Sequence, residues 1–293
     1  MKAGCPSSTS LLIARALLLA HATPALRELL VHESASLTRK FLDAAGSLRW
    51  FDIVLSAPFL RRAMFTAVSL LLPGILLHWL ARKRLLDALA HEAFDSGCRQ
   101  IVVLGAGLDT LAWRLQSACA CFELDHPATQ AIKRRACLDG PVLIAADLVH
   151  DSVAEALRTL PQFVANQPTL FVAEGLLMYL PPERVAALLR EISALSAPGS
   201  RFAFTFMEAR PGHPIGFHNC RRVIDWWLSL RREQMSWALA RTDVEAFAFQ
   251  HGWHLASLST AEELRRRFLT PLGLGSAPLA IGESVGLATR REP

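Results

Sequence analysis

A short apolar run that ends in a glycine turn constrains the fold of this chain more than any other feature. Ile101 to Leu104 form the run, and Gly105 and Gly107 follow at once. A continuous apolar run bounded by glycine is typical of a strand buried on both faces, and helical spacing begins at Leu108. Strand, glycine turn and helix open a nucleotide-binding βαβ unit, in which glycine lets the backbone approach a ligand.

The residues around this turn indicate which ligand it could bind. Asp125 ends the next predicted strand, at a spacing where an acid can accept hydrogen bonds from ribose hydroxyls. Asp109 and Thr110 begin the predicted helix, where a carboxylate suits the helix dipole but repels a phosphate. We therefore expect a ligand that has a ribose and no phosphate, such as S-adenosylmethionine. An ordinary tight turn would also show two glycines at this spacing.

Strands and helices alternate through most of the chain after residue 98. Strands are predicted at 101–104, 120–125, 142–146, 169–173, 201–207, 253–258 and 279–288. Helices are predicted between them, at 83–94, 108–117, 127–138, 151–160, 182–196, 241–251 and 261–270. This alternation predicts an α/β fold with a doubly wound, Rossmann-like, mostly parallel seven-stranded sheet. We expect an N-terminal helical cap at 1–81 and a cofactor-binding domain at 82–293, with an insertion at 208–240.

Residues 63–81 form an apolar stretch that lacks Asp, Glu, Lys and Arg. Its length matches a marginal membrane span. Because Pro73 and Gly74 lie at its centre, we predict two short helices joined by a turn, which pack over the cofactor crevice, and no stable membrane span. The apolar run near the N-terminus is interrupted by Arg15, which favours an amphipathic helix over a signal peptide.

Composition narrows the class of protein and its partners. Hydrophobic residues make up 52% of the chain, enough for a large core. The six cysteines form no CxxC pair, which indicates free thiols, a reducing compartment and a cytoplasmic location. The net charge of +5 is spread over short clusters without interleaved aromatics, so we expect no nucleic-acid partner.

Three acids follow three successive predicted strands. They are Asp125, Asp147 and Glu174. Because ligands in open α/β sheets bind at the carboxyl ends of the strands, these side chains should line one crevice with the glycine turn. Any one of them could instead cap the helix that follows.

Seven segments of the chain are similar to those of a known family and occur in the same order. They are ARKRLLD (81–87), RQIVVLGAGLDTLAWRL (99–115), FELDHPATQAIKRR (122–135), AADL (145–148), PTLFVAEGLLMYLPPERV (168–185), APGSRFAFTFME (197–208) and HGWHLAS (251–257). In these segments the chain resembles a bacterial-type member of the leucine carboxyl methyltransferase family of class I S-adenosylmethionine-dependent methyltransferases.

The resemblance implies a role for each of these positions. Arg82 would pair with the carboxylate of S-adenosylmethionine, Gly105 and Gly107 would pass its methionine part, and Asp125 would hold its ribose. The adenine edge would meet Asp147 and Leu148, and the amino or sulfonium end would lie near Glu174. An arginine fork suits a carboxylate, and acids suit an ammonium and a cationic donor.

The sequence indicates an enzyme that transfers a methyl group to a carboxyl or hydroxyl oxygen of a small apolar metabolite. Glu174 and Tyr179 are the candidate catalytic residues, although Tyr179 could be a core aromatic. A carboxylate acceptor needs no general base, whereas a phenol or alcohol does. We expect no metal, because His251 and His254 have no third ligand in sight. A protein C-terminus, a modified RNA base or a non-catalytic regulatory role are the alternatives.

The insertion is predicted to shape the acceptor pocket. Its aromatic and apolar side chains could form a lid over an apolar acceptor, and its arginines could steer an anionic oxygen. A buried stripe beside a solvated basic face is the other interpretation. The residues concerned are Phe217, Trp226, Trp227, Leu228, Leu230 and Trp237, with Arg221, Arg222, Arg231 and Arg232.

Overall fold

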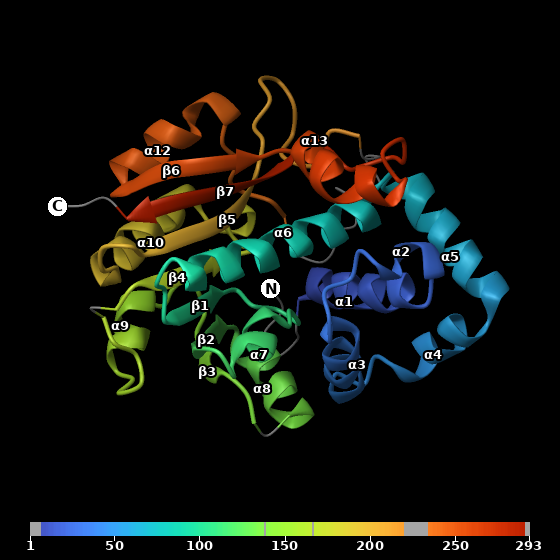
Figure 1. Cartoon of the computed structure of the whole chain (residues 1–293), viewed down its shortest axis with the longest axis horizontal. Helices are drawn as coiled ribbons and strands as arrows, with labels where there is room; N and C mark the ends of the chain where they lie inside the picture. Colours follow the sequence, from blue (N-terminus) through green and yellow to red (C-terminus); the bar gives the residue numbers. More distant parts are fainter. Residues whose placement is uncertain (1–6, 138, 166, 220–233, 291–293) are drawn as a thin grey trace.

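The computed structural model describes residues 7–137, 139–165, 167–219 and 234–290. Their strands form one seven-stranded sheet in the order β3-β2-β1-β4-β5-β7-β6 (Figure 1). Only β7 is antiparallel to its neighbours, which confirms the predicted doubly wound, mostly parallel α/β sheet. The strands are β1 (Gln100–Leu104), β2 (Ala120–Asp125), β3 (Val142–Ala145), β4 (Thr169–Ala173), β5 (Arg201–Met207), β6 (Trp253–Ser259) and β7 (Glu283–Arg290).

Helices cover both faces of the sheet, because β1 is apolar on both faces. Successive side chains of a strand point to opposite sides. Ile101 and Val103 pack with α6, α7 and α13, whereas Val102 and Leu104 pack with α9, α10 and α12. These helices are α6 (Ile75–Asp95), α7 (Leu111–Leu115), α9 (Val153–Arg158), α10 (Pro182–Leu195), α12 (Val244–Gln250) and α13 (Ala261–Leu264).

The N-terminal helices form a layer at one end of the sheet, beside α7 and α8 (Figure 1). Their own core joins that of the sheet through the edge of Phe41 against Trp113, with ring centroids 5.3 Å apart. The packing of these helices against one another places α1 beside the glycine turn that follows β1. The helices are α1 (Ser8–His21), α2 (Pro24–Arg27), α3 (Ser34–Ala44), α4 (Arg49–Ser56) and α5 (Pro58–Leu71), with α8 at Pro127–Ala136.

The apolar stretch 63–81 is broken where the sequence predicts. The expectation that both halves pack over the cofactor crevice was wrong for α5, because only Trp79 of this stretch lines that crevice and α5 has no buried residue. Helix α5 ends at Leu71, and Gly74 adopts a left-handed conformation with φ +75° before α6 begins. The predicted separate helix from Lys83 was wrong, because α6 continues unbroken from Ile75 to Asp95 and crosses the expected boundary at 81/82. Of the described helices, none alone is long and apolar enough to cross a membrane, while the α4–α5 pair passes on composition but bends by 102°.

Several further element bounds differ from the predictions, among them those of one helix and one strand at the cavity rim or beside it. The helix expected at 108–117 is shortened to α7, because Asp109 accepts a hydrogen bond from the backbone N–H of Leu111 (2.6 Å) and holds the preceding residues in a turn. The last strand begins at Glu283, four positions after the expected start. Short 3-10 and π segments complete the fold, namely η1 (Leu177–Tyr179), η2 (Arg241–Asp243), η3 (Arg265–Leu269) and η4 (Thr270–Leu272).

The described parts of the insertion lie along the end of β5. Glu208 and Leu239 form a bridge, and Trp237 is buried. The predictions for Arg221, Arg222, Trp226, Trp227, Leu228, Leu230, Arg231 and Arg232 lie outside the described residues.

Candidate active site

A cavity of about 480 Å³ lies at the carboxyl ends of β1 to β4. Its size is that of a site for a small molecule or cofactor. All eight residues that were predicted from the sequence to form the cofactor and catalytic site line this cavity, although they come from six separate stretches of the chain. They are Arg82, Gly105, Gly107, Asp125, Asp147, Leu148, Glu174 and Tyr179.

Neighbouring residues pack closely against the glycine turn, which explains why its glycines carry no side chains. Gly105 and Gly107 have φ values of +62° and +51°, a region that favours glycine. A Cβ atom on Gly105 would lie 2.7 Å from Leu176, and one on Gly107 would lie 3.1 Å from the Cβ of Ser10. The first turn of α1 therefore rests on this turn, and the serine-rich start of α1 becomes part of the cavity wall.

Asp125 is held by the turn that it faces. Its Oδ2 accepts the N–H of Gly107 and its Oδ1 accepts the N–H of His126, both at 2.6 Å. Burial raises the pKa of Asp125, and these backbone donors offset part of that rise. Because each carboxylate oxygen can accept a second hydrogen bond, the side chain keeps acceptor capacity for a ligand in the cavity.

Arg82 is clamped between two carboxylates. Its Nη1 donates to both oxygens of Glu283, at 2.8 and 2.7 Å, while Nε and Nη2 donate to Glu174 Oε1, at 3.0 and 2.7 Å. Burial alone would lower the pKa of Arg82, but the charges of Glu283 and Glu174 raise it above its ordinary value. Burial would raise the pKa of Glu283, but Arg82 lowers it to about 2. The guanidinium therefore stays charged, and these four bonds leave one of its five N–H groups for a ligand.

Lys83 connects this clamp to the helix that follows the glycine turn. Its Nζ donates to Glu174 Oε2 at 3.1 Å and also to Asp109. Burial would raise the pKa of Asp109, but the charge of Lys83 lowers it. Asp109 is thus neutralised by an ion pair with Lys83, a contact that was not predicted from the sequence, where this acid stood as a charge that repels a phosphate.

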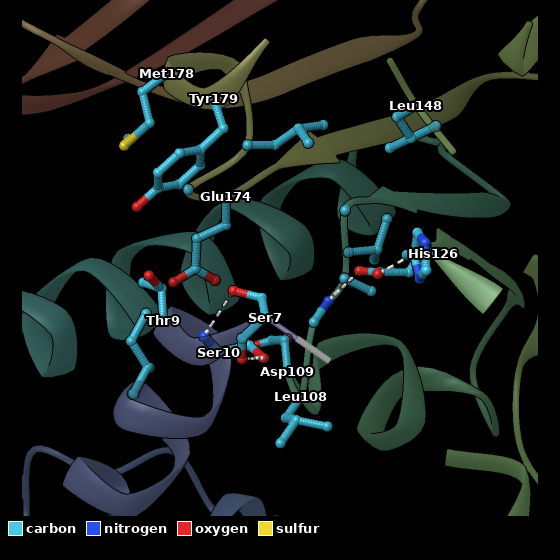
Figure 2. A pocket seen from close by; sticks show the side chains of 18 of the residues that line it. Ser7, Thr9, Ser10, Leu108, Asp109, His126, Leu148, Glu174, Met178 and Tyr179 are labelled. Atoms are coloured by element: carbon cyan, nitrogen blue, oxygen red, sulfur yellow. Dashed lines mark hydrogen bonds between the residues drawn. The ribbon is translucent and has the colours of Figure 1, made fainter. Parts of the chain in front are cut away.

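Different elements line the two ends of the cavity (Figure 2). Glu174 and Tyr179 lie at one end with Thr9 and Met178, and His126 and Leu148 lie at the other. Apolar side chains from the helical cap and the insertion line the cavity as well, and they are Ile13, Trp79, Phe217 and Met235.

Asp147 lines the cavity and also accepts a hydrogen bond from the nearby backbone. Its Oδ1 accepts the N–H of Val149 at 3.1 Å, which closes a local turn. The helix-capping alternative for this acid was wrong, because Ser152 caps the helix that follows, α9. The turn places Leu148 in the cavity wall, 6% exposed. Its carbonyl oxygen accepts a hydrogen bond from Arg184 at 2.8 Å, which anchors the turn to α10.

Three residues of this site were not predicted from the sequence. Lys83 stood in the basic cluster after the apolar stretch, which was a usable signal, and Ser10 stood in the polar start of α1. Glu283 gave no such signal, because the last strand was expected to contain it in its interior. The antiparallel direction of β7 places the start of that strand on the same rim where the parallel strands end.

The charges on the wall suit a cationic ligand. Five carboxylates and two basic side chains line the cavity, a formal excess of three negative charges with neutral histidines. S-adenosylmethionine has an ammonium, a sulfonium and one carboxylate, so its net charge is complementary. The remaining N–H of Arg82 suits its carboxylate, and the acceptor capacity of Asp125 suits ribose hydroxyls.

Comparisons with known proteins agree with this geometry. The family model described as leucine carboxyl methyltransferase matches residues 38–193. A proposed S-adenosyl-L-methionine-dependent methyltransferase of Mycobacterium marinum is 32% identical over 276 residues, which are 88% of this chain and 84% of the relative. A similarly described protein of Mycolicibacterium smegmatis is 34% identical over 199 residues, 63% of this chain and 65% of that relative.

Solved structures show the same fold at low sequence identity. A DUF574 family protein from Streptomyces avermitilis superposes with a TM-score of 0.60 and 16% identity, over 88% of this chain and 98% of the other. A proposed methyltransferase from Thermobifida fusca superposes with a TM-score of 0.56 and 16% identity, over 87% of this chain and 94% of the other.

Proposed function

Because the chain belongs to the leucine carboxyl methyltransferase family of S-adenosylmethionine-dependent methyltransferases, we propose that it methylates a carboxyl or hydroxyl oxygen of a small apolar metabolite. The observation that supports the proposal is a single cavity lined by both charged and apolar side chains. Acids and the glycine turn suit the cofactor, and Trp79, Phe217 and Met235 add apolar surface for an acceptor. This combination of a polar anchor and an apolar chamber is typical of small-molecule sites.

The residues of the chain fit S-adenosylmethionine, whose sulfonium supplies an electrophilic methyl group when it is bound. Asp125 would accept hydrogen bonds from the ribose hydroxyls, and Asp147 and Leu148 would border the adenine. Gly105 and Gly107 line the cavity, and the methionine part would pass their backbone, which adopts a left-handed conformation that favours glycine. Glu174 and Arg82 would hold the amino and carboxylate groups.

The chain itself would mainly align the acceptor and exclude water. Methyl transfer is an in-line displacement, so orientation of the acceptor oxygen provides much of the rate enhancement. Tyr179 and Glu174 lie on the same side of the cavity (Figure 2). For a carboxylate acceptor, the Tyr179 hydroxyl would donate a hydrogen bond that orients the oxygen. For a phenol, Glu174 would accept the proton that the hydroxyl releases, at the cost of its contacts to Arg82 and Lys83.

The proposal is tested by turnover of methyl-labelled S-adenosylmethionine. Aromatic and fatty acids, phenols, leucine-terminated peptides and transfer RNA are compared, each with and without a chelator. We expect label in an apolar acid or phenol and no effect of the chelator. Label only in peptide or only in RNA, or binding of the cofactor without turnover of any acceptor, would contradict the proposal.

We also propose that the protein works in the cytoplasm. Four cysteines of the described residues carry free thiols, in keeping with a reducing compartment. Localisation of a tagged full-length chain by cell fractionation tests this, and recovery from an oxidising compartment would contradict it.

A further inference from the structure

Exposed apolar side chains gather on two helices away from the active-site cavity. Ten large hydrophobic residues of the described chain are exposed, and five of them lie on α4 and α5. Trp50 and Ile53 on α4 are 47% and 63% exposed, and Phe59 and Leu70 on α5 are 72% and 57% exposed. Scattered single apolar residues are normal on a surface, whereas a cluster indicates an interaction site.

The outer face of α5 is largely apolar. Its exposed residues recur at helical spacing, and no residue of the helix is buried. The outer face of a helix on a globular protein usually has charged and polar side chains. Here Arg62 is the one charge and Thr66 the one uncharged polar residue among the exposed members, which are Pro58, Phe59, Arg62, Ala63, Thr66, Ala67, Leu70 and Leu71.

The charges on α4 and α5 are mostly basic. Helix α5 contains Arg61 and Arg62 and no acid, and Arg49 begins α4. The single acid of the pair, Asp52, is neutralised by Arg39 at 2.7 Å. The surface therefore combines apolar side chains with basic flanks.

The two helices are held in a fixed shape. They meet at 102° around Ala57, and they form the outer edge of the molecule, away from the sheet (Figure 1). Arg61 bonds the carbonyl oxygen of Leu55 across the bend, and the guanidinium of Arg15 lies 4.7 Å from the ring of Trp50. The bend presents the apolar side chains outward without exposing a cavity or a sheet edge.

We propose that α4 and α5 dock on a membrane surface rich in anionic lipid. The apolar side chains enter the boundary between headgroups and acyl chains, and the arginines meet the lipid phosphates. Tryptophan is favoured at that depth, because its ring is apolar and its N–H is polar. The helices lie in the interface and do not cross the bilayer, because their bend is too sharp for a span.

A second copy of this chain fits the surface less well. An isologous contact would bring arginines of the same sign together, because each copy presents the same surface to the other. Anionic lipid satisfies both the apolar and the basic groups.

Co-sedimentation of the full-length protein with lipid vesicles tests the proposal. Vesicles of phosphatidylcholine alone are compared with vesicles that contain about 30% phosphatidylglycerol, at about 50 and 300 mM salt. We expect binding to the anionic vesicles that weakens with salt. The double variant Ile53→Ser/Phe59→Ser should lower the partition coefficient at least tenfold, and Arg62→Glu about fivefold or more.

Matched variants elsewhere on the surface serve as controls. Phe249→Ser and Arg158→Glu change exposed residues of the same kinds on α12 and α9 and should leave vesicle binding unchanged. Equal binding to both vesicle types, no binding to either, or equal losses in the control variants would overturn the proposal. A concentration-dependent dimer that Phe59→Ser abolishes, without vesicle binding, would assign the surface to self-association instead.

Discussion

Glu283 binds Arg82 through both of its carboxylate oxygens, although 201 residues separate them in the chain. The same carboxylate accepts a hydrogen bond from Nε2 of His78, one helical turn before Arg82, at 2.8 Å. All three side chains are almost fully buried. The first residue of the antiparallel strand thus positions a residue of α6 at the rim where the parallel strands end.

Replacing Glu283 should therefore disturb both stability and the cofactor site. Glu283→Gln leaves a buried guanidinium with one charged partner, and we expect a loss of about 3 kcal/mol in the free energy of unfolding. Affinity for S-adenosylmethionine should fall in the same variant, and Glu283→Asp should restore part of both. Denaturant unfolding and titration calorimetry measure these effects. The exposed pair of Glu263 with Arg266 is the control, because Glu263→Gln should change neither quantity.

Asp125 is expected to contribute affinity for the ribose. Asp125→Ala removes an acceptor of two hydroxyl hydrogen bonds, a cost of about 2 to 3 kcal/mol and thus about 30- to 150-fold in the dissociation constant. Titration calorimetry with S-adenosylmethionine measures this change in affinity. Asp95→Ala, at an exposed position of α6, is the control and should leave the affinity unchanged. Unchanged affinity in a folded Asp125→Ala protein would refute the assignment.

Gly107 allows a test that separates backbone strain from crowding. Gly107→Ala forces a left-handed conformation on alanine, at about 1 to 3 kcal/mol, and presses a methyl group against Ser10. Gly46 also has a left-handed φ, +64°, but no atom lies within 4 Å of the position that a Cβ would occupy. Gly46→Ala therefore measures the backbone strain without the crowding. We expect both variants to unfold at lower temperature but only Gly107→Ala to weaken cofactor binding. Equal cofactor affinity in the two variants would show that contact with α1 is irrelevant.

Tyr179 is expected to act on the acceptor and not on the cofactor. Tyr179→Phe removes the hydroxyl but keeps the ring, so kcat/KM for the acceptor should fall at least tenfold while the dissociation constant of S-adenosylmethionine stays unchanged. Steady-state kinetics and calorimetry on the same preparation distinguish the two quantities. A parallel loss of cofactor affinity would instead assign Tyr179 to the cofactor.

The buried pair of Glu123 and Lys133 predicts a pH dependence of stability. Burial raises the pKa of Glu123 to about 7, although Lys133 Nζ lies 2.7 Å away and opposes the rise. Because the folded pKa exceeds the unfolded value, the folded state binds the proton more tightly. The contribution of Glu123 to the free energy of unfolding is fully present below about pH 4.5. It falls by about 3 kcal/mol as the pH rises through 7. Denaturant unfolding between pH 5 and 8 should show this slope in the native protein and not in Glu123→Gln.

The sequence alone determined the sheet, the glycine turn and the acids at the strand ends. These features follow from local spacing, because an apolar run, a glycine or an acid after a strand has its meaning within a few residues. The parallel strands then bring Asp125, Asp147 and Glu174 to one rim, which topology makes predictable.

Only the tertiary structure decided which residues complete that rim. Glu283 joins Arg82 because β7 enters between β5 and β6 in the opposite direction, and no local pattern records a strand's direction. Ser10 closes the glycine turn because α1 packs against it from about 100 residues away. Contacts of this kind depend on the arrangement of whole elements, so they are absent from the spacing of residues along the chain.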